Sequence, residues 1–152
     1  MNDNITIREM LIEDYDKVRA LWMMISGFGI RSMDDSREGV TRFLLRNPGC
    51  SVVAELDGEI IGAILCGHDG RRGCLYHVCV HPDHRKQGIG KTMVVFAMEA
   101  LKKEQINKVC LIAFTRNDIG NAFWKEIGWT KREDLNYYDF ELNKENITAF
   151  NQ

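Results

Sequence analysis

The hydrophobic residues follow two patterns along the chain: helical spacing in some segments and short apolar runs in others. Apolar residues recur at helical spacing within residues 14–27, 36–47, 89–103 and 117–127. Short apolar runs typical of strands lie at residues 4–9, 51–56, 59–66, 74–80 and 108–115, and residues 129–142 have room for one or two more. The pattern predicts an α/β (α+β) fold with a mixed central sheet of about six to seven strands and about four helices.

Turn residues set the directions of these strands. Asp57-Gly58 between two apolar runs is a strong hairpin signal, because a tight turn with positive φ favours Asp-Gly. Residues 69–73 form a second turn, and Pro82 ends the third strand. The strand at 74–80, the helix at 89–103 and the strand at 108–115 then form a crossover, which predicts a parallel pair after antiparallel strands.

Length and composition favour one domain over residues 1–152, with residues 143–152 expected as a frayed polar tail. The chain is 45% hydrophobic and 28% charged, which is ordinary for a globular protein. A net charge of -2 gives no basic field for nucleic acid or an anionic membrane. We find neither a secretion signal nor a run of 18 apolar residues, so we expect a soluble cytoplasmic protein.

The five cysteines lie inside apolar runs and are odd in number, so we expect reduced core thiols rather than a disulfide framework. A zinc-binding structural domain is an alternative, because His77, Cys79, His81 and His84 lie close together in the sequence. The chain lacks the paired-ligand spacing and the second cluster of a structural zinc site. We therefore expect no metal.

Residues 78–92 carry the clearest chemical signal, a strand followed by a turn of small and basic residues and then a helix start. Unpaired N–H groups and the helix dipole make such a helix start an anion site. Gly88 and Gly90 let an anion approach the backbone, while Arg85, Lys86 and Lys91 add positive charge. The combination predicts a site for a pyrophosphate.

Two familiar phosphate loops fail on spacing. Gly90-Lys91-Thr92 looks like the end of a P-loop, but that motif needs a glycine where Arg85 stands. A dinucleotide fingerprint that starts at Gly88 needs a third glycine at Met93.

The loop does resemble the R/Q-x-x-G-x-G/A motif of the GNAT superfamily of acetyl-CoA-dependent N-acetyltransferases. Residues 85–90 read Arg-Lys-Gln-Gly-Ile-Gly, after an apolar strand and before a long helix. Asn117 and the run Phe123-Trp124 to Gly128-Trp129 resemble the family's later elements. The likeness spans about residues 5–142, including the hairpin and Gly62.

The resemblance implies that acetyl-CoA is the co-substrate and that its pantetheine arm pairs with the strand at 78–80 as an added strand. N–H groups from Lys86 to Lys91 would hold the pyrophosphate, and Asn117 would contact the pantetheine. The implied coenzyme-binding residues are Val78, Cys79, Val80, Arg85, Lys86, Gln87, Gly88, Ile89, Gly90, Lys91, Thr92, Asn117 and Trp124.

The family likeness makes the backbone N–H of Cys79 the expected donor to the oxyanion. Trp124 stands where many members have an acidic tyrosine, and Ile112 stands where some have a basic glutamate. Tyr138 is our candidate for the acid, ahead of Tyr137, although a half-buried strand tyrosine has the same pattern.

His77 is the candidate base for the ammonium proton, ahead of Tyr76 and Glu55. A histidine in an apolar strand is more often a hydrogen-bonded core residue.

The resemblance implies that the first two helices, their connecting loop and the late strands bind the acceptor, a primary amine on a small molecule, an amino acid or a protein N-terminus. The residues concerned are Trp22, Phe28, Ile30, Arg31, Met33, Asp34, Asp35 and Tyr138. Residues 34–36 also suit a simple helix cap. Two further hypotheses are a coenzyme-binding module with weak or no catalysis, motivated by Trp124 and Ile112, and a homodimer formed at Trp129 or at strand edges near Tyr137.

Overall fold

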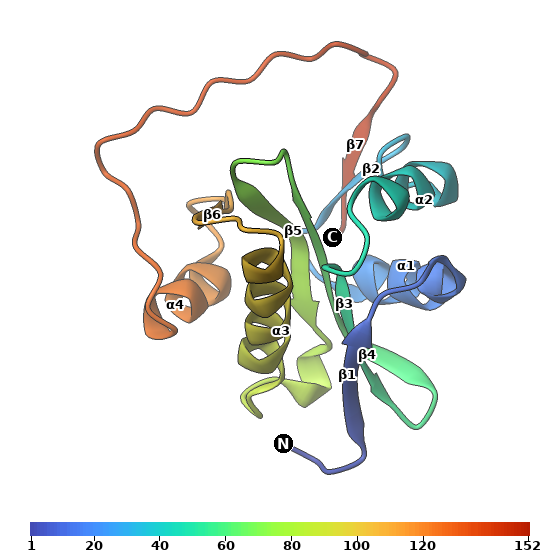
Figure 1. The fold of residues 1–152 in the computed structure, drawn as a ribbon. Coiled ribbons are helices and arrows are strands. Elements are labelled where there is room, and N and C mark those ends of the chain that lie inside the picture. The colour runs from blue at the N-terminus through green and yellow to red at the C-terminus, as the bar shows by residue number, and fades with distance from the viewer.

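A five-stranded sheet with the order β1-β3-β4-β5-β6 forms the centre of the computed structural model, which describes residues 1–152 (Figure 1). The first four strands are antiparallel neighbours, and β6 runs parallel to β5. The strands span Ile5–Glu9 (β1), Val52–Leu56 (β3), Glu59–His68 (β4), Gly73–Val80 (β5) and Val109–Cys110 (β6). The mixed sheet, the antiparallel start and the parallel crossover are confirmed.

Helices cover both faces of this sheet and bury two apolar cores. They are α1 (Tyr15–Met24), α2 (Arg37–Arg46), α3 (Ile89–Lys103) and α4 (Asp118–Glu126), with short 3₁₀ turns at Ile12–Asp14 and Pro82–His84. Trp22 of α1 packs in the core with Val53 and Ala63, whereas Met93 of α3 packs in the core with Val52 and Ile64. Adjacent strand residues thus serve opposite cores, as the pleat requires. None of the helices has the length and apolarity needed to cross a membrane.

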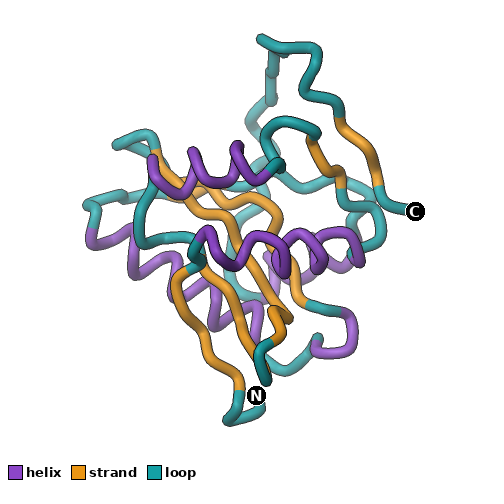
Figure 2. The backbone as a smooth tube through the Cα atoms, turned by 90° about the vertical axis from the view of Figure 1, so that its right-hand side faces the viewer, coloured by secondary structure: helices purple, strands orange, loops and turns teal.

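A second sheet pairs two short strands that the hydrophobic pattern did not predict, β2 (Gly29–Arg31) and β7 (Thr148–Phe150). Figure 2 shows this ribbon apart from the central sheet, with the C-terminus beside it. The expected frayed tail is therefore tied down in part: Asn151 donates its side-chain N–H groups to the carbonyls of Trp22 and Ile25 at 2.8 and 2.9 Å. The seven strands are divided between two sheets rather than gathered in one.

The predicted strands in the C-terminal half are only partly present. Of residues 108–115, only Val109 and Cys110 pair with β5. Residues 129–142 contain no strand, and the chain arches away from the body between α4 and β7 (Figure 1). No backbone hydrogen bond involves residues 130–142. A strand needs a neighbour to satisfy its backbone, and within one copy of the chain this segment has none.

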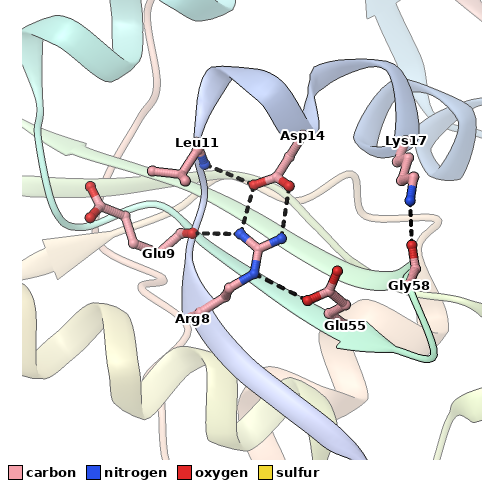
Figure 3. A network of polar contacts seen from close by, with 7 residues as sticks. All are labelled: Arg8, Glu9, Leu11, Asp14, Lys17, Glu55 and Gly58. Atoms are coloured by element: carbon pink, nitrogen blue, oxygen red, sulfur yellow. Dashed lines mark hydrogen bonds and ion pairs between the residues drawn. The ribbon is translucent and has the colours of Figure 1, made fainter.

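A charged network fixes the start of α1 against the sheet (Figure 3). The Arg8 guanidinium of β1 donates to both carboxylate oxygens of Asp14 at 2.8 Å and to Glu55 of β3 at 3.3 Å. Asp14 also accepts from the Leu11 N–H at 2.8 Å, and Lys17 donates to the Gly58 carbonyl. The network joins β1, the β3–β4 hairpin and α1.

Candidate active site

The loop between β5 and α3 has the geometry of an anion site. Lys86 and Gly88 adopt left-handed conformations with φ of 63° and 83°, and Gly88 caps α3 without a side-chain cap bond. The backbone N–H groups from Lys86 to Lys91 donate to no acceptor within the protein. A β-carbon at Gly88 would find nothing within 4 Å, so the space beside the backbone is open. These unpaired donors lie where the helix dipole is positive.

Contacts around the loop hold it against the end of β5. Arg85 Nε donates to the Val80 carbonyl at 3.2 Å, and the Thr92 hydroxyl donates to the Gly88 carbonyl at 2.8 Å. Gly90 serves packing, because a β-carbon there would approach the Phe123 ring of α4 to 3.1 Å. The two glycines of the motif therefore act differently, one through φ and one through close contact.

The edge of β5 that leads to this loop is open. β6 pairs with β5 only at Gly73 and Cys74, so the remainder of β5 has no neighbour on that side. On the other side, Cys79 lies opposite Ala63, and His81 donates its N–H to the Ile61 carbonyl at 2.7 Å. Because successive residues direct their N–H groups to opposite edges, the N–H of Cys79 faces β4 like that of His81.

The same alternation directs the N–H groups of Val78 and Val80 to the open edge. The Cys79 N–H, the expected oxyanion donor, thus faces β4, whereas the Val78 N–H faces the open edge. The sequence did not reveal these directions, because backbone direction leaves no mark on residue type.

His77 forms a bulge in β5 that sets this register. Its φ is 49°, and the pairing with β4 shifts between Ala63 and Leu65. The ring Nε2 lies 3.0 Å from Oδ1 of Asp35, and the ring packs against Trp22 and Phe28 at centroid distances of 4.8 and 5.1 Å. The pair is nearly buried, with 12% of the His77 side chain and 5% of the Asp35 side chain exposed.

The open strand β5 and the loop after it lie in a region of the chain that is shared with known proteins. The profile of the Acetyltransferase (GNAT) family matches residues 7–129. Acetyltransferase ECA0875 of Pectobacterium atrosepticum is 34% identical over 104 residues, covering 68% of this chain and 70% of its own. Acetyltransferase SG1711 of Sodalis glossinidius is 28% identical over 129 residues, covering 85% and 89%.

The chain belongs to the acetyltransferase (GNAT) family. It is an acetyl-CoA-dependent acyltransferase, as the motif at residues 85–90 predicted. The fold agrees: the PaiA N-acetyltransferase of Thermoplasma acidophilum, solved with coenzyme A, superposes with a TM-score of 0.70 at 21% identity, covering 84% of this chain and 89% of its own.

Two predicted coenzyme contacts of the acetyltransferase lie on α4. Asn117 caps this helix by accepting the Gly120 N–H at 3.0 Å. Trp124 is half-buried between Phe123 and Trp129, with ring centroids at 5.0 and 4.7 Å. Its place in an aromatic cluster explains why a bulky apolar ring is accommodated at the position of the usual tyrosine.

The other predicted catalytic side chains are scattered. Tyr138 is 86% exposed on the segment that leaves the body, and Ile112 is 66% exposed beyond β6. Glu55 bonds to Arg8. Hydrogen bonding to Cys74 and burial both raise the pKa of Tyr76. Among the predicted catalytic side chains, His77 lies beside a buried carboxylate, that of Asp35, and Glu55 is paired with Arg8.

The cysteines are free thiols, and no three His, Cys, Asp or Glu side chains gather closely enough to hold an ion. Cys79 is buried in the core shared with α1, and this burial raises the pKa of its thiol to about 12. Cys79 is therefore a protonated core residue near neutral pH.

Some of the predicted acceptor residues are buried, and others line a hollow on the surface. Trp22 is fully buried, and Asp35 accepts the Arg31 N–H at 2.7 Å and the Tyr15 hydroxyl at 2.6 Å. A hollow of about 270 Å³ lies beside them, lined in part by Tyr15, Arg19, Ile30, Arg31 and Arg37. The helix cap expected at residues 34–36 is confirmed, because the Ser36 hydroxyl accepts the Gly39 N–H at 3.0 Å at the start of α2.

Proposed function

We propose that this acetyltransferase moves an acetyl group from acetyl-CoA to a primary amine of a small molecule, an amino acid or a protein N-terminus. The neutral amine attacks the thioester carbonyl, and the tetrahedral intermediate expels the coenzyme A thiolate. The amine loses one proton and the thiolate gains one. The observation that carries the proposal is the row of unpaired N–H groups from Lys86 to Lys91 at the end of an open strand.

The coenzyme would lie along β5. Its pyrophosphate would accept from the loop N–H groups, with Arg85 and Lys91 supplying positive charge. The pantetheine arm would pair with the free edge as an added strand. In this placement the Val78 N–H donates to the carbonyl oxygen of the thioester and stabilises the oxyanion.

Two side chains carry the proton steps of the proposal. His77 takes the proton of the ammonium group, directly or through water, and Asp35 orients its ring through the 3.0 Å contact. Tyr138 donates to the departing thiolate, which requires the segment that carries it to dock on a sheet.

The hollow beside Asp35 supports an acceptor with a carboxylate near its amine. Its lining includes Arg19, Arg31 and Arg37, and no lysine. Guanidinium groups bind carboxylates in a bidentate manner. Asp34, which accepts from Asn146 at 2.8 Å, lies at the same α1–α2 connection and suits a cationic amine. Amino acids and peptide N-termini combine both groups.

Thermal unfolding with and without acetyl-CoA tests the coenzyme site. A ligand at a hundred times its Kd adds about 2.7 kcal/mol of stability. We expect a clear rise in Tm that Gly88→Glu abolishes, because the new carboxylate repels the pyrophosphate. Gly70→Glu is the matched control: Gly70 also has positive φ and open space, yet lies in the β4–β5 turn. No rise in the wild type, or an equal loss in both variants, contradicts the site.

The alternative is a coenzyme-binding module with weak or no catalysis, favoured by Trp124 and Ile112 at the positions of the usual acid and base. Both proposals predict the rise in Tm. Release of free coenzyme A thiol with a panel of amines separates them, because only the enzyme gives release that depends on the acceptor.

A further inference from the structure

Two of the five cysteines lie opposite each other where β6 joins the central sheet (Figure 1). β5 and β6 pair in parallel, with Gly73 opposite Val109 and Cys74 opposite Cys110. Residues in register on neighbouring strands direct their side chains to the same face, so the two thiols share one face of the sheet. Cys74 is half-buried, and Cys110 is exposed rather than in the core as the sequence predicted. The pair is therefore open to solvent from the Cys110 side.

The spacing of the two strands suits a disulfide. Neighbouring strands lie about 4.7–4.9 Å apart, and disulfides usually join cysteines whose Cα atoms are about 4.4–6.8 Å apart. Burial raises the pKa of the Cys74 thiol, and a hydrogen bond with the Cys110 thiol raises it further, while Tyr76 lowers it. Because the thiols already contact each other, a bond between the two sulfurs needs rotation of the side chains and little movement of the backbone.

The other three cysteines are shielded from solvent. Cys50, Cys66 and Cys79 are 2%, 0% and 6% exposed. Cys50 donates its thiol to the Cys66 carbonyl at 2.8 Å, and both residues lie in the core beneath α3. Cys79 lies in the other core, packed with residues of α1. An oxidant dissolved in water therefore meets the Cys110 thiol first, because exposure governs the oxidation of cysteine.

We propose that Cys74 and Cys110 form a redox-sensitive dithiol, which hydrogen peroxide oxidises to a disulfide that joins β5 to β6. In the first step, the Cys110 sulfur attacks one oxygen of the peroxide, which breaks the O–O bond, leaves a sulfenic acid on Cys110 and releases one water. In the second step, the Cys74 sulfur attacks the sulfenic sulfur, forms the S–S bond and releases a second water. Two thiols thus lose two electrons and two protons, and one peroxide is reduced to two waters.

The surroundings of the two thiols assign their roles. Cys110 is the exposed member, so its sulfur receives the oxygen. The raised pKa of Cys74 keeps this thiol protonated near neutral pH, which makes it a poor first nucleophile. Its position opposite Cys110 makes it the resolving thiol, which reacts only after the sulfenic acid has formed. Added dithiothreitol reverses the bond by thiol–disulfide exchange.

The disulfide secures a very short strand. β6 has two residues, which pair with two residues of β5 beside the bond from the Gly73 N–H to the Lys108 carbonyl at 2.9 Å. The free edge of β5 begins directly after Cys74. A covalent bond between Cys74 and Cys110 therefore fixes the point at which β5 and β6 separate.

Peptide mapping after oxidation tests the pairing. The folded protein is treated with hydrogen peroxide, its remaining thiols are alkylated, and it is digested with trypsin without a reductant. We expect the peptide 73–85 to be linked to the peptide 109–116, and dithiothreitol to separate them. Fragmentation of the linked peptides places the bond at Cys74 rather than at Cys79, which lies in the same peptide. No link, a link at Cys79, or a link between two chains through Cys110 overturns the proposal.

Cys50 and Cys66 are the internal control, because they are also neighbours but are buried. Both lie in the peptide 47–71, and we expect both to remain available for alkylation once the peroxide-treated protein is unfolded. Oxidation of this pair to the same extent as Cys74 and Cys110 overturns the selectivity that exposure provides.

Two variants test the roles of the thiols. Cys110→Ser, at an exposed position, loses the link and leaves Cys74 reduced. In Cys74→Ser the sulfenic acid has no resolving thiol, so excess peroxide carries Cys110 to the sulfinic acid, whereas the wild type stops at the disulfide. The mass of the peptide 109–116 reports this difference. Equal formation of sulfinic acid in the wild type and in Cys74→Ser overturns the role of Cys74. None of these readouts depends on acetyl transfer.

Discussion

His77, near the candidate site, has a φ of 49° inside a strand. A non-glycine residue in the left-handed region costs about 1–3 kcal/mol. The contact with Asp35 and the packing against Trp22 and Phe28 offset this cost. The bulge is therefore stabilised by contacts on the α1 side of the sheet. Its effect is on the edge of β5, where it determines which N–H groups face the open side.

Replacement of His77 by asparagine separates catalysis from binding. Asparagine tolerates positive φ but lacks the imidazole, so we expect the bulge and coenzyme binding to persist. Loss of a general base lowers kcat by about 100-fold or more. The measurements are kcat and the Tm shift with acetyl-CoA. An unchanged kcat would mean that His77 only shapes the strand.

At the scale of single residues, the sequence predicted the loop at the start of α3 but not the directions of the N–H groups on β5. Residues 85–90 indicate the loop through glycines and basic side chains, which are properties of residue type. Whether the N–H of Val78 or that of Cys79 faces the open edge depends on a one-residue bulge. A bulge reverses the alternation that follows it, and nothing in the apolar run 74–80 marks where it occurs.

Among the elements, α1 depends on a buried carboxylate at its start. Burial alone would raise the pKa of Asp14, but hydrogen bonds from Arg8 and the Leu11 N–H outweigh it and lower the pKa. A lowered folded pKa means that the ionised form stabilises the fold above the usual value of 3.8. This contribution is lost as the pH falls through the lower, folded value.

We expect Asp14→Asn to cost about 1–3 kcal/mol of unfolding free energy near neutral pH, because it weakens charge-assisted bonds to Arg8. The difference from the wild type shrinks at acid pH, where Asp14 is protonated in both states. Urea unfolding at several pH values measures it. Asp16→Asn, which removes an exposed partner of Arg37, is the control and should change stability by less than about 1 kcal/mol. A difference independent of pH would contradict the role of ionisation.

The helices were predicted to within a few residues, whereas the late strands were not. Helical hydrogen bonds are local, so the apolar spacing in residues 89–103 suffices to define α3. Strands at 108–115 and 129–142 need hydrogen-bonding partners from elsewhere in the chain, and the local apolar pattern does not identify these partners. Both segments were predicted as strands, and in the structure only Val109 and Cys110 of them pair with another strand.

Across the whole molecule, the C-terminus closes the structure around α1. β7 pairs with β2, and the Asn151 backbone exchanges hydrogen bonds with Phe28 and Gly27 at 2.9 and 3.2 Å. These contacts join residues far apart in the sequence, and they have no local signal because three-residue strands carry too little periodicity. They also fix the C-terminal end of the segment 130–142, which makes no backbone hydrogen bond of its own.

Asn151→Ala tests this closure. Its side chain satisfies the carbonyls of Trp22 and Ile25 at the end of α1, and alanine would leave both without that partner. We expect a loss of about 1–3 kcal/mol in unfolding free energy, read from the urea midpoint at constant slope. Asn107→Ala is the control, since Asn107 is exposed and its side chain makes no hydrogen bond within the protein. Equal stability of the two variants would show that β7 holds the C-terminus without the Asn151 side chain, because its backbone bonds survive in both.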